Sequence, residues 1–255
     1  MTIKIHPIKA FSDNYIWILH NEQHAVVVDP GDDSPVESYL SQHKLTLTDI
    51  LITHHHYDHV DGLVALQNKW QCTVYAPEDV RIPGQCTPVG AGDKVTIESL
   101  KLIFNVLFTP GHTLTHICYH DEGKLFCGDT LFSLGCGRMF EGTAEQFNSS
   151  LNQLKQLNDE TKVYCTHEYT SSNWEFAFAT MPNKQALNEF KNALDLKRKK
   201  GQPSLPSTLS TEKFMNPFLN CDLFEVVQNL ENKFDVKIIS DSQAFGLLRQ
   251  WKDSF

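Results

Sequence analysis

The sequence predicts an α/β domain followed by a smaller helical domain. In the first two-thirds of the chain, short runs of β-branched and aromatic residues alternate with turns. After about residue 170, the apolar residues recur at helical spacing instead. The chain has 255 residues, which is enough to bury a core in one large and one small domain. We therefore predict a first domain over residues 1–170 and a second over residues 171–255.

The first domain is predicted to contain strands that turns and a few helices separate. The turn Asp29-Pro-Gly-Asp-Asp ends the third strand, because proline and glycine interrupt regular structure. A helix is expected at 143–157, where Phe147, Leu151 and Leu154 share one face. The predicted strands are 3–8, 15–19, 25–28, 47–53, 72–75, 94–109 (one strand or a hairpin), 117–119, 124–127 and 163–165, and the other helices are 34–41 and 62–70.

The second domain is predicted to be helical. Apolar residues recur at helical spacing over 184–199, 223–234 and 242–252. The basic run at 197–200 closes the first of these helices, where cations favour the helix dipole, and Gly201 can cap it. A segment rich in proline and serine, 202–210, follows.

Charge and composition exclude some classes of partner. There are 22 Lys and Arg residues against 31 Asp and Glu, a formal charge of −9. A net anion repels phosphate backbones, so we expect no nucleic-acid partner. No apolar run approaches the roughly 18 residues that span a membrane, so we expect no membrane partner either. The seven cysteines are scattered and form no Cys-x-x-Cys pair, and the N-terminal segment carries no targeting signal. We therefore expect reduced thiols in a cytoplasmic protein, and a monomer.

A histidine-rich segment follows the apolar strand at 47–53. Residues 53–62, Thr-His-His-His-Tyr-Asp-His-Val-Asp-Gly, hold four of the twelve histidines. Imidazole and carboxylate are the usual protein ligands of zinc, iron and manganese. Residues two apart on an extended backbone point the same way, so His54 and His56 can share one ion. A surface cluster that binds metal only fortuitously is the alternative.

The same segment can supply a second ion site. Asp58 and His59 lie at the turn into the next predicted helix, and they can face a second ion. His55 and Tyr57 point elsewhere. Asp61 is expected to be exposed.

Three further candidate ligands each follow a predicted strand. They are His112 in Thr-Pro-Gly-His, Asp129 in Cys-Gly-Asp-Thr and His167 in Cys-Thr-His-Glu. Each alone is a weak signal, because a single polar residue at a strand end is more often structural. If the strands share a sheet, however, their ends can converge on one rim, which argues against a fortuitous cluster.

These motifs resemble the metallo-β-lactamase superfamily. The Thr-His-x-His-x-Asp-His-x-x-Gly signature is followed, in order, by Pro-Gly-His, Gly-Asp-Thr and a later His. The resemblance implies an αββα sandwich for the α/β domain. Within the superfamily, the chain is similar to the glyoxalase II family through 135–143 (Gly-Cys-Gly-Arg-Met-Phe-Glu-Gly-Thr) and 166–170 (Thr-His-Glu-Tyr-Thr). The Pro-Ser-Thr-Leu, Asn-Pro-Phe and Leu-Arg-x-x-Lys motifs of 206–252 extend this similarity through a C-terminal helical domain.

The resemblance implies a thioesterase with two divalent metal ions. Its activity would be hydrolysis of S-D-lactoylglutathione to glutathione and D-lactate by a metal-bridging hydroxide, a step of methylglyoxal detoxification. Zinc is favoured over iron or manganese. Asp58 can also accept a proton during catalysis. The family's ligand pattern places His54, His56 and His112 on one ion, Asp58, His59 and His167 on the other, and Asp129 between them.

The resemblance also implies where glutathione binds. Arg249 and Lys252 lie three residues apart on one face of a predicted helix and would contact its glycine carboxylate. Arg138 and Tyr169 would contact the tripeptide. Phe140 stands where some members have tyrosine, so one substrate hydrogen bond is lost there. Asn220 stands where we expect arginine, and this difference from the family pattern lies away from the metal ligands.

Other functions compete with this prediction. A persulfide dioxygenase of the same fold would use one iron, and would need neither the basic pair nor a full helical domain. A β-lactamase, a lactonase or another thioesterase of the fold is a further alternative. A non-catalytic metal-binding scaffold would have the same ligands but would be inert toward every thioester. The remaining histidines, His6, His20, His24, His43, His116 and His120, are expected to have no role in the site.

Overall fold

The computed structural model describes residues 2–255. The chain divides into two compact units. Unit 1 comprises residues 1–108, 115–121 and 125–128, and unit 2 comprises 109–114, 122–124 and 129–255. Met1, with which the predicted first domain begins, lies outside the described residues. The domain boundary predicted after residue 170 stays a prediction.

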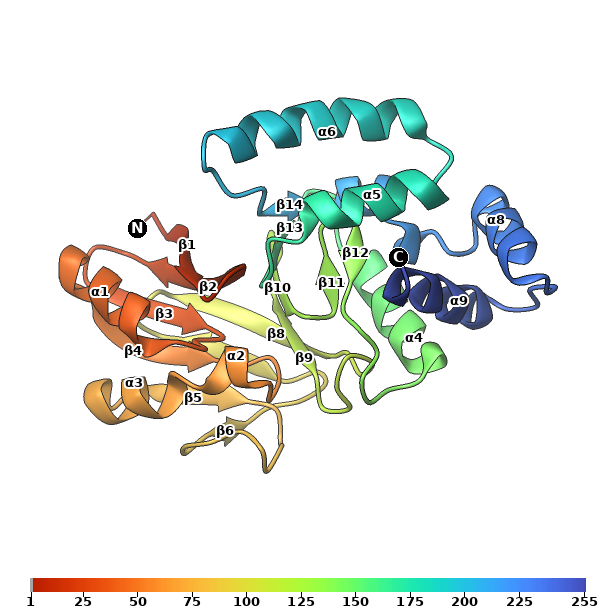
Figure 1. Cartoon of the computed structure of the whole chain (residues 1–255). Helices are drawn as coiled ribbons and strands as arrows, with labels where there is room; N and C mark the ends of the chain where they lie inside the picture. The colour runs from red at the N-terminus through yellow and green to blue at the C-terminus, as the bar shows by residue number, and fades with distance from the viewer. Residues whose placement is uncertain (1) are drawn as a thin grey trace. The chain divides into compact units, whose positions relative to one another are not determined.

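Most elements of unit 1 are strands (Figure 1). The region predicted as one strand or a hairpin, 94–109, forms a hairpin, and a single-turn helix lies within the histidine-rich segment. In chain order the elements are β1 (Lys4–Ala10), β2 (Asn14–His20), β3 (His24–Val28), α1 (Asp33–His43), β4 (Thr46–Leu51), α2 (Tyr57–Val60), α3 (Leu63–Trp70), β5 (Thr73–Ala76), β6 (Thr87–Pro88), β7 (Lys94–Ile97), β8 (Leu102–Phe108), β9 (Ile117–His120) and β10 (Lys124–Gly128).

The first sheet of unit 1 has the strand order β1-β2-β3-β4-β5-β6. Strands β1 to β3 pair antiparallel, and β3 to β6 pair parallel. Helices α1 and α3 lie on one side of this sheet (Figure 1) and bury Val36 and Leu40 of α1 and Leu63 and Leu66 of α3. Every residue of β2 is buried, which shows that both faces of this sheet are covered.

A second sheet covers the other face. Within unit 1, β7 to β10 pair antiparallel in chain order. The buried hydroxyl of Tyr119 on β9 lies 2.9 Å from the carbonyl oxygen of Ile52 and 3.1 Å from that of Tyr75. The two sheets therefore stack around a shared apolar core, and β4 ends inside it.

The loop after β3 closely contacts the helix that carries two candidate ligands. Asp29 has a positive φ of 52° and is buried. A Cβ atom at Gly31 would lie 2.0 Å from the carbonyl oxygen of Asp58. Only glycine allows this approach, so the Pro-Gly turn predicted after β3 also seats α2.

Unit 2 is mainly helical. Its elements are β11 (Leu131–Phe132), β12 (Gly135–Cys136), α4 (Ala144–Lys155), β13 (Lys162–Cys165), α5 (Thr170–Thr180), α6 (Lys184–Lys199), β14 (Ser207–Thr208), α7 (Leu209–Met215), the 3₁₀ turn η1 (Pro217–Leu219), α8 (Phe224–Phe234) and α9 (Asp241–Asp253). Helix α4 begins with a capping box between Thr143 and Gln146. The sequence patterns do not predict α5, α7 or the β11–β12 hairpin.

An aromatic cluster holds the helices of unit 2 together. The ring of Phe147 on α4 lies 5.4 Å from that of Phe245 on α9. Phe218 of η1 lies 5.8 Å from Phe245 and 5.8 Å from Phe176 on α5. Such rings are buried and contribute strongly to packing. The C-terminal helix α9 is therefore fixed against α4 and α5.

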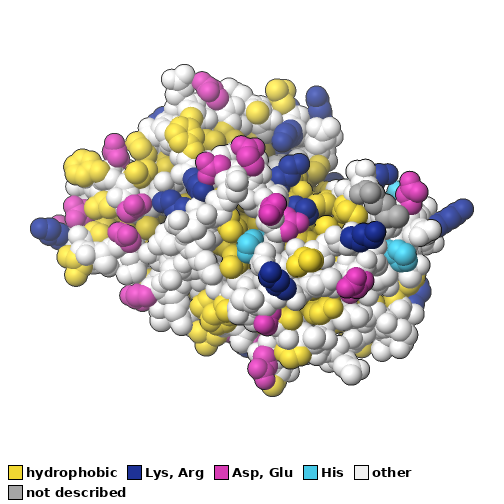
Figure 2. All heavy atoms as spheres, turned by 180° about the vertical axis from the view of Figure 1, so that it is seen from behind, with side chains coloured by type: hydrophobic (Ala, Val, Ile, Leu, Met, Phe, Trp, Pro, Cys, Tyr) yellow, Lys and Arg dark blue, Asp and Glu magenta, His cyan; other side chains and the backbone are white. Residues whose placement is uncertain are grey.

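The surface shows no single-sign charge patch on the face drawn in Figure 2, where acidic and basic side chains intermingle. Over the described residues 2–255, no helix is both long and apolar enough to cross a membrane. None of the seven cysteines, all of which lie within residues 2–255, forms a disulfide.

Candidate active site

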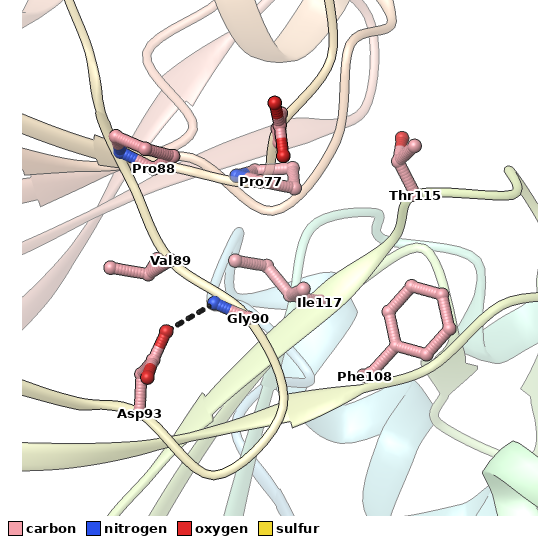
Figure 3. A pocket seen from close by; sticks show the side chains of 9 residues that line it. Pro77, Pro88, Val89, Gly90, Asp93, Phe108, Thr115 and Ile117 are labelled. Carbon is pink, nitrogen blue, oxygen red and sulfur yellow. Dashed lines mark hydrogen bonds between the residues drawn. The ribbon is translucent and has the colours of Figure 1, made fainter.

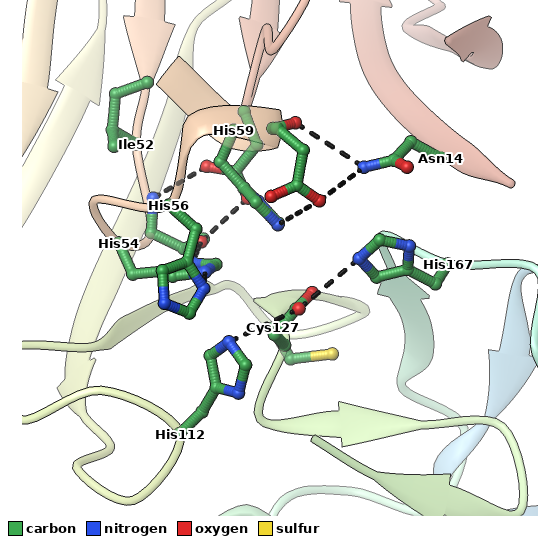
Figure 4. Close-up of polar contacts among 12 residues, drawn as sticks. Asn14, Ile52, His54, His56, His59, His112, Cys127 and His167 are labelled. Atoms are coloured by element: carbon green, nitrogen blue, oxygen red, sulfur yellow. Dashed lines mark hydrogen bonds and ion pairs between the residues drawn. The ribbon is translucent and has the colours of Figure 1, made fainter. Parts of the chain in front are cut away.

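In unit 1, the end of β4 positions the first pair of candidate ligands. His54 Nε2 lies 3.0 Å from His56 Nδ1, so two ring nitrogens converge (Figure 4). Thr53 Oγ1 donates to Asp29 Oδ2 at 2.7 Å and lies 3.1 Å from His54 Nδ1. Because that hydroxyl uses its hydrogen on Asp29, it accepts from His54 Nδ1. His54 therefore keeps a lone pair on Nε2, the atom that faces His56.

Helix α2 positions the second pair. His59 Nδ1 lies 3.0 Å from Asp29 Oδ2, and its Nε2 lies 3.6 Å from Asp58 Oδ2 (Figure 4). A carboxylate accepts hydrogen bonds, so Nδ1 donates to Asp29 and Nε2 carries the lone pair that can bind a metal. Asn14 Nδ2 donates to Asp58 Oδ2 at 2.9 Å. Asp29 thus orients His59 directly and His54 through Thr53.

The His55 ring packs edge-on against that of His56, with the ring centroids 4.8 Å apart. Its Nδ1 lies 3.5 Å from Asp79 Oδ2. Asp79 also accepts from Arg81 Nη2 at 2.7 Å and from Thr115 Oγ1 at 2.6 Å. Hydrogen bonds from Arg81 hold the pKa of Asp79 well below its usual range. The His55 contact ties the ligand segment to the loop after β5.

His116 packs against a candidate ligand, although it was expected to have no role in the site. Its ring stacks on that of His54 at 4.8 Å with an interplanar angle of 24°, and it is fully buried. It therefore fixes the plane of the His54 ring.

In unit 2, one carboxylate oxygen lies between two imidazoles. Asp129 Oδ2 is 3.4 Å from His112 Nε2 and 3.3 Å from His167 Nε2 (Figure 4). His112 Nδ1 lies 2.8 Å from the carbonyl oxygen of Arg138. Because a carbonyl only accepts, Nδ1 carries the hydrogen and Nε2 carries the lone pair that can bind a metal. Each unit therefore presents imidazole nitrogens and carboxylate oxygens, and this set of donor atoms fits a divalent ion.

A cavity of about 510 Å³ opens beside these ligands in unit 2. All five residues predicted to bind substrate line it together with two predicted metal ligands. The lining residues are His112, Asp129, Phe132, Cys136, Arg138, Phe140, Tyr169, Ser172, Asn173, Arg249 and Lys252. Three of them are basic, which gives the cavity a local positive charge in an acidic protein.

The three basic side chains of the cavity differ in their surroundings. The Arg249 guanidinium is buried, donates from Nη1 to the carbonyl oxygen of Cys136 at 3.0 Å and pairs with Asp253 at 2.9 Å. Lys252 Nζ donates to the carbonyl oxygen of Ser172 at 3.1 Å. Burial, together with the charge of Arg249, lowers the pKa of Lys252. The Arg138 side chain is 66% exposed and can move toward a ligand.

Two aromatic residues of the cavity contact the candidate ligands. The Tyr169 ring stacks on that of His167 at 4.7 Å with an interplanar angle of 2°. The exposed Phe140 ring meets that of His112 edge-on at 5.3 Å. Phe140 thus offers an apolar contact where a tyrosine would offer a hydroxyl.

Another cavity, in unit 1, has a different character (Figure 3). It measures about 300 Å³, and its lining residues are Pro77, Glu78, Pro88, Val89, Gly90, Asp93, Phe108, Thr115 and Ile117. Its ionisable lining residues are acidic, and Asp93 Oδ2 accepts from Gly90 N at 2.8 Å, which closes the loop. An anionic ligand is therefore disfavoured there.

Comparison with known proteins decides the family. Residues 11–167 match the model of the metallo-beta-lactamase superfamily, and residues 168–255 match that of the hydroxyacylglutathione hydrolase C-terminus. A hydroxyacylglutathione hydrolase from Nitrosomonas europaea is 44% identical, over 99% of this chain and 97% of its own. One from Aliivibrio salmonicida is 47% identical, over 98% and 99%. The chain belongs to the hydroxyacylglutathione hydrolase family.

Solved structures agree on the fold. ETHE1 from Myxococcus xanthus is 27% identical with a TM-score of 0.65, and the match covers 100% of this chain and 99% of that one. The BLEG-1 B3 metallo-beta-lactamase is 22% identical with a TM-score of 0.61, over 86% and 99%. This chain therefore has the predicted metallo-β-lactamase fold and C-terminal helical domain. It also has groups of histidine and aspartate residues that are able to bind a metal.

Sequence reasoning missed several residues of this hydrolase that orient candidate ligands. Asn14 and Asp79 contact ligand-segment side chains but belong to no motif. Thr53 begins the metal-binding signature, but its hydrogen bond to Asp29 was not predicted. The motif order gave a signal for Thr53 alone, since it precedes His54 directly. Strand pairing positions Asn14, and a loop positions Asp79. A sequence pattern reveals neither contact.

Proposed function

We propose that the protein hydrolyses S-(2-hydroxyacyl)glutathiones, with S-D-lactoylglutathione as the leading substrate, to glutathione and a 2-hydroxy acid. The reaction would serve methylglyoxal detoxification. One observation carries the proposal: the unit 2 cavity combines two candidate metal ligands with three basic side chains. Glutathione has two carboxylates, so a positively charged cavity beside a hydrolytic centre suits its thioesters. The 44–47% identity to hydroxyacylglutathione hydrolases supports the same reaction.

We further propose two divalent metal ions, zinc ahead of iron or manganese. His54, His56 and His112 would hold one ion, Asp58, His59 and His167 the other, and Asp129 would bridge them. The position of Asp129 Oδ2 between two imidazole nitrogens supports the bridging role. When bound, such a pair of ions supplies Lewis-acid polarisation of the thioester carbonyl and a water nucleophile active near neutral pH.

The chain's own residues would orient the ligands and the substrate. Asp29 and the Arg138 carbonyl fix the tautomers of His59 and His112, so the ligand nitrogens are ready for binding. Asp58 would accept the proton of the attacking water in addition to its role as a ligand. The thiolate of glutathione is a good leaving group, so no strong general acid is required.

Substrate contacts follow from the cavity. Arg249 and Lys252 would attract the glycine carboxylate, with Lys252 Nζ free to exchange its backbone acceptor for a carboxylate. Arg138 and Tyr169 would contact the rest of the tripeptide. Phe140 would pack on apolar atoms of the substrate and contribute no hydrogen bond.

The test is the hydrolysis of S-D-lactoylglutathione by purified protein, with metal content measured on the same sample. We expect rapid turnover that chelation abolishes and added metal restores. The D-lactoyl thioester of N-acetylcysteamine, which lacks the glutathione carboxylates, serves as the control substrate and should react much more slowly. Protein with two ions bound and no turnover would refute the proposal and direct assays to glutathione persulfide and lactones. Size-exclusion chromatography and cell fractionation test the accompanying proposal of a cytoplasmic monomer.

A further inference from the structure

The β11–β12 hairpin forms part of the cavity wall in unit 2. Phe132 and Cys136 of this hairpin line the cavity, and Phe132 also meets the ring of His167 edge-on at 5.6 Å. The turn residue Leu134 has a positive φ of 57°. A bulky side chain rarely adopts this conformation, and it persists only where the surroundings hold it. Something outside the hairpin must therefore fix the turn.

Helix α7 supplies a fully buried carboxylate at this turn. Glu212 is 0% exposed, and its Oε2 accepts from Leu134 N at 2.8 Å. Asn216, one helical turn later and also fully buried, donates from Nδ2 to that oxygen at 3.0 Å. Asn216 Nδ2 lies 3.1 Å from the carbonyl oxygen of Phe132 and 2.9 Å from that of Gly135. The two side chains therefore bond to both strands of the hairpin and to its turn.

A carboxylate in this position is costly. Burial raises the pKa of Glu212 to about 6. An apolar side chain would pack there without the desolvation penalty of a charge. What Glu212 provides and an apolar residue does not is an acceptor for the amide of a strained turn.

We propose that Glu212, with Asn216, is a positioning residue for the substrate cavity: it fixes the β11–β12 hairpin, and through it Phe132 and Cys136. The role rests on the proposed function, since it is defined by binding of a glutathione thioester. Glu212 bonds to the backbone amide of Leu134, so it acts on the cavity wall through the backbone of the hairpin. The helical part of unit 2 therefore contributes to substrate binding beyond the basic residues of α9.

The test compares Glu212→Gln, which keeps an acceptor oxygen, with Glu212→Leu, which removes it. Glu189→Leu, on the exposed surface of α6, is the matched control. With S-D-lactoylglutathione, we expect Glu212→Leu to raise KM about tenfold or more, because small displacements of a binding wall are costly. Its kcat should change less than about threefold, since the contact acts on binding. Glu212→Gln should have a KM near the wild-type value.

A second readout does not depend on the substrate. The Cys136 thiol is buried on the hairpin, and burial raises its pKa to about 11, so native alkylation should be slow. Peptide mass spectrometry after iodoacetamide treatment should show faster alkylation of Cys136 in Glu212→Leu but not in Glu212→Gln.

The outcomes separate the two proposals. A wild-type KM in Glu212→Leu with a lowered melting temperature would overturn the positioning role and leave a structural one. Equal impairment of the Gln and Leu variants would overturn the role of the acceptor. If the wild-type protein hydrolyses no glutathione thioester, the proposed function fails. In that case an unchanged Cys136 alkylation rate in Glu212→Leu still overturns the fixing of the hairpin, and a faster rate supports it.

Discussion

Asn14 donates a hydrogen bond of 2.9 Å from Nδ2 to Oδ2 of Asp58. Asn14 is the first residue of β2 and is buried, so the strand holds the amide rigidly against α2. We expect Asn14→Ala to weaken metal binding about 10- to 100-fold, the usual effect of removing a group that orients a metal ligand. Competition with a chromophoric chelator measures the affinity of the apoprotein directly.

The control for this substitution is Asn68→Ala. Asn68 is exposed on α3 in the same unit, and its side chain lies outside the ligand segment. Its metal affinity should equal that of the wild type. An Asn14→Ala protein with unchanged affinity would show that Asp58 needs no orienting partner.

Asp129 is predicted to be indispensable for both ions. Because Asp129 Oδ2 lies between His112 and His167, Asp129→Ala should reduce the metal content of both sites. Turnover should fall at least about a hundredfold, since metal-ion catalysis supplies several kcal/mol. Elemental analysis and kinetics on the same sample check this. Asp61→Ala, an exposed aspartate in the histidine-rich segment, should keep its metals. Near-normal turnover with full metal content in Asp129→Ala would rule out the bridge.

The ligand segment could be predicted from the sequence because the pattern that identifies it lies within a few consecutive residues. Alternation on an extended backbone places His54 and His56 on one side, and the structure has their ring nitrogens 3.0 Å apart. The strands that lead to Asp129 and His167 were predictable for the same reason, since each is a short apolar run. The exposure of Asp61 was predicted and is confirmed.

The missed features depend on contacts far apart in sequence. Helix α5 is apolar on several sides, so its pattern has no clear period, and the β11–β12 strands have only two residues each. Glu212 and Leu134 are 78 residues apart, and no local pattern pairs them. His116 was expected to have no role in the site, yet it stacks on His54, because β9 brings it there.

Lys252 and Arg249 are predicted to have separable effects. Lys252→Ala should raise KM for glutathione thioesters about tenfold, the loss expected for one charged hydrogen bond, with little change in kcat or melting temperature. Arg249→Ala should raise KM and also lower the melting temperature, because Arg249 bonds the backbone of Cys136 and pairs with Asp253.

Steady-state kinetics and thermal denaturation of both variants distinguish these effects. Lys199→Ala, exposed on α6, is the matched control for the loss of a positive charge. If Lys252→Ala leaves KM unchanged, Lys252 does not belong to the binding site. If Arg249→Ala keeps the wild-type melting temperature, its backbone contacts contribute little.

Glu212 should make stability depend on pH. Burial raises its pKa from 4.5 to about 6 in the folded protein. The folded state then binds this proton more tightly than the unfolded state, so the contribution is present below pH 4.5 and lost as the pH rises through about 6. The free energy of unfolding of the wild type, minus that of Glu212→Gln, should therefore fall by about 2 kcal/mol between pH 4 and pH 7. Urea denaturation of both proteins measures this difference, in which the shared titration of the metal ligands cancels. A difference that stays constant would show that folding leaves the pKa of Glu212 near 4.5, and a difference that rises with pH would show that folding lowers it.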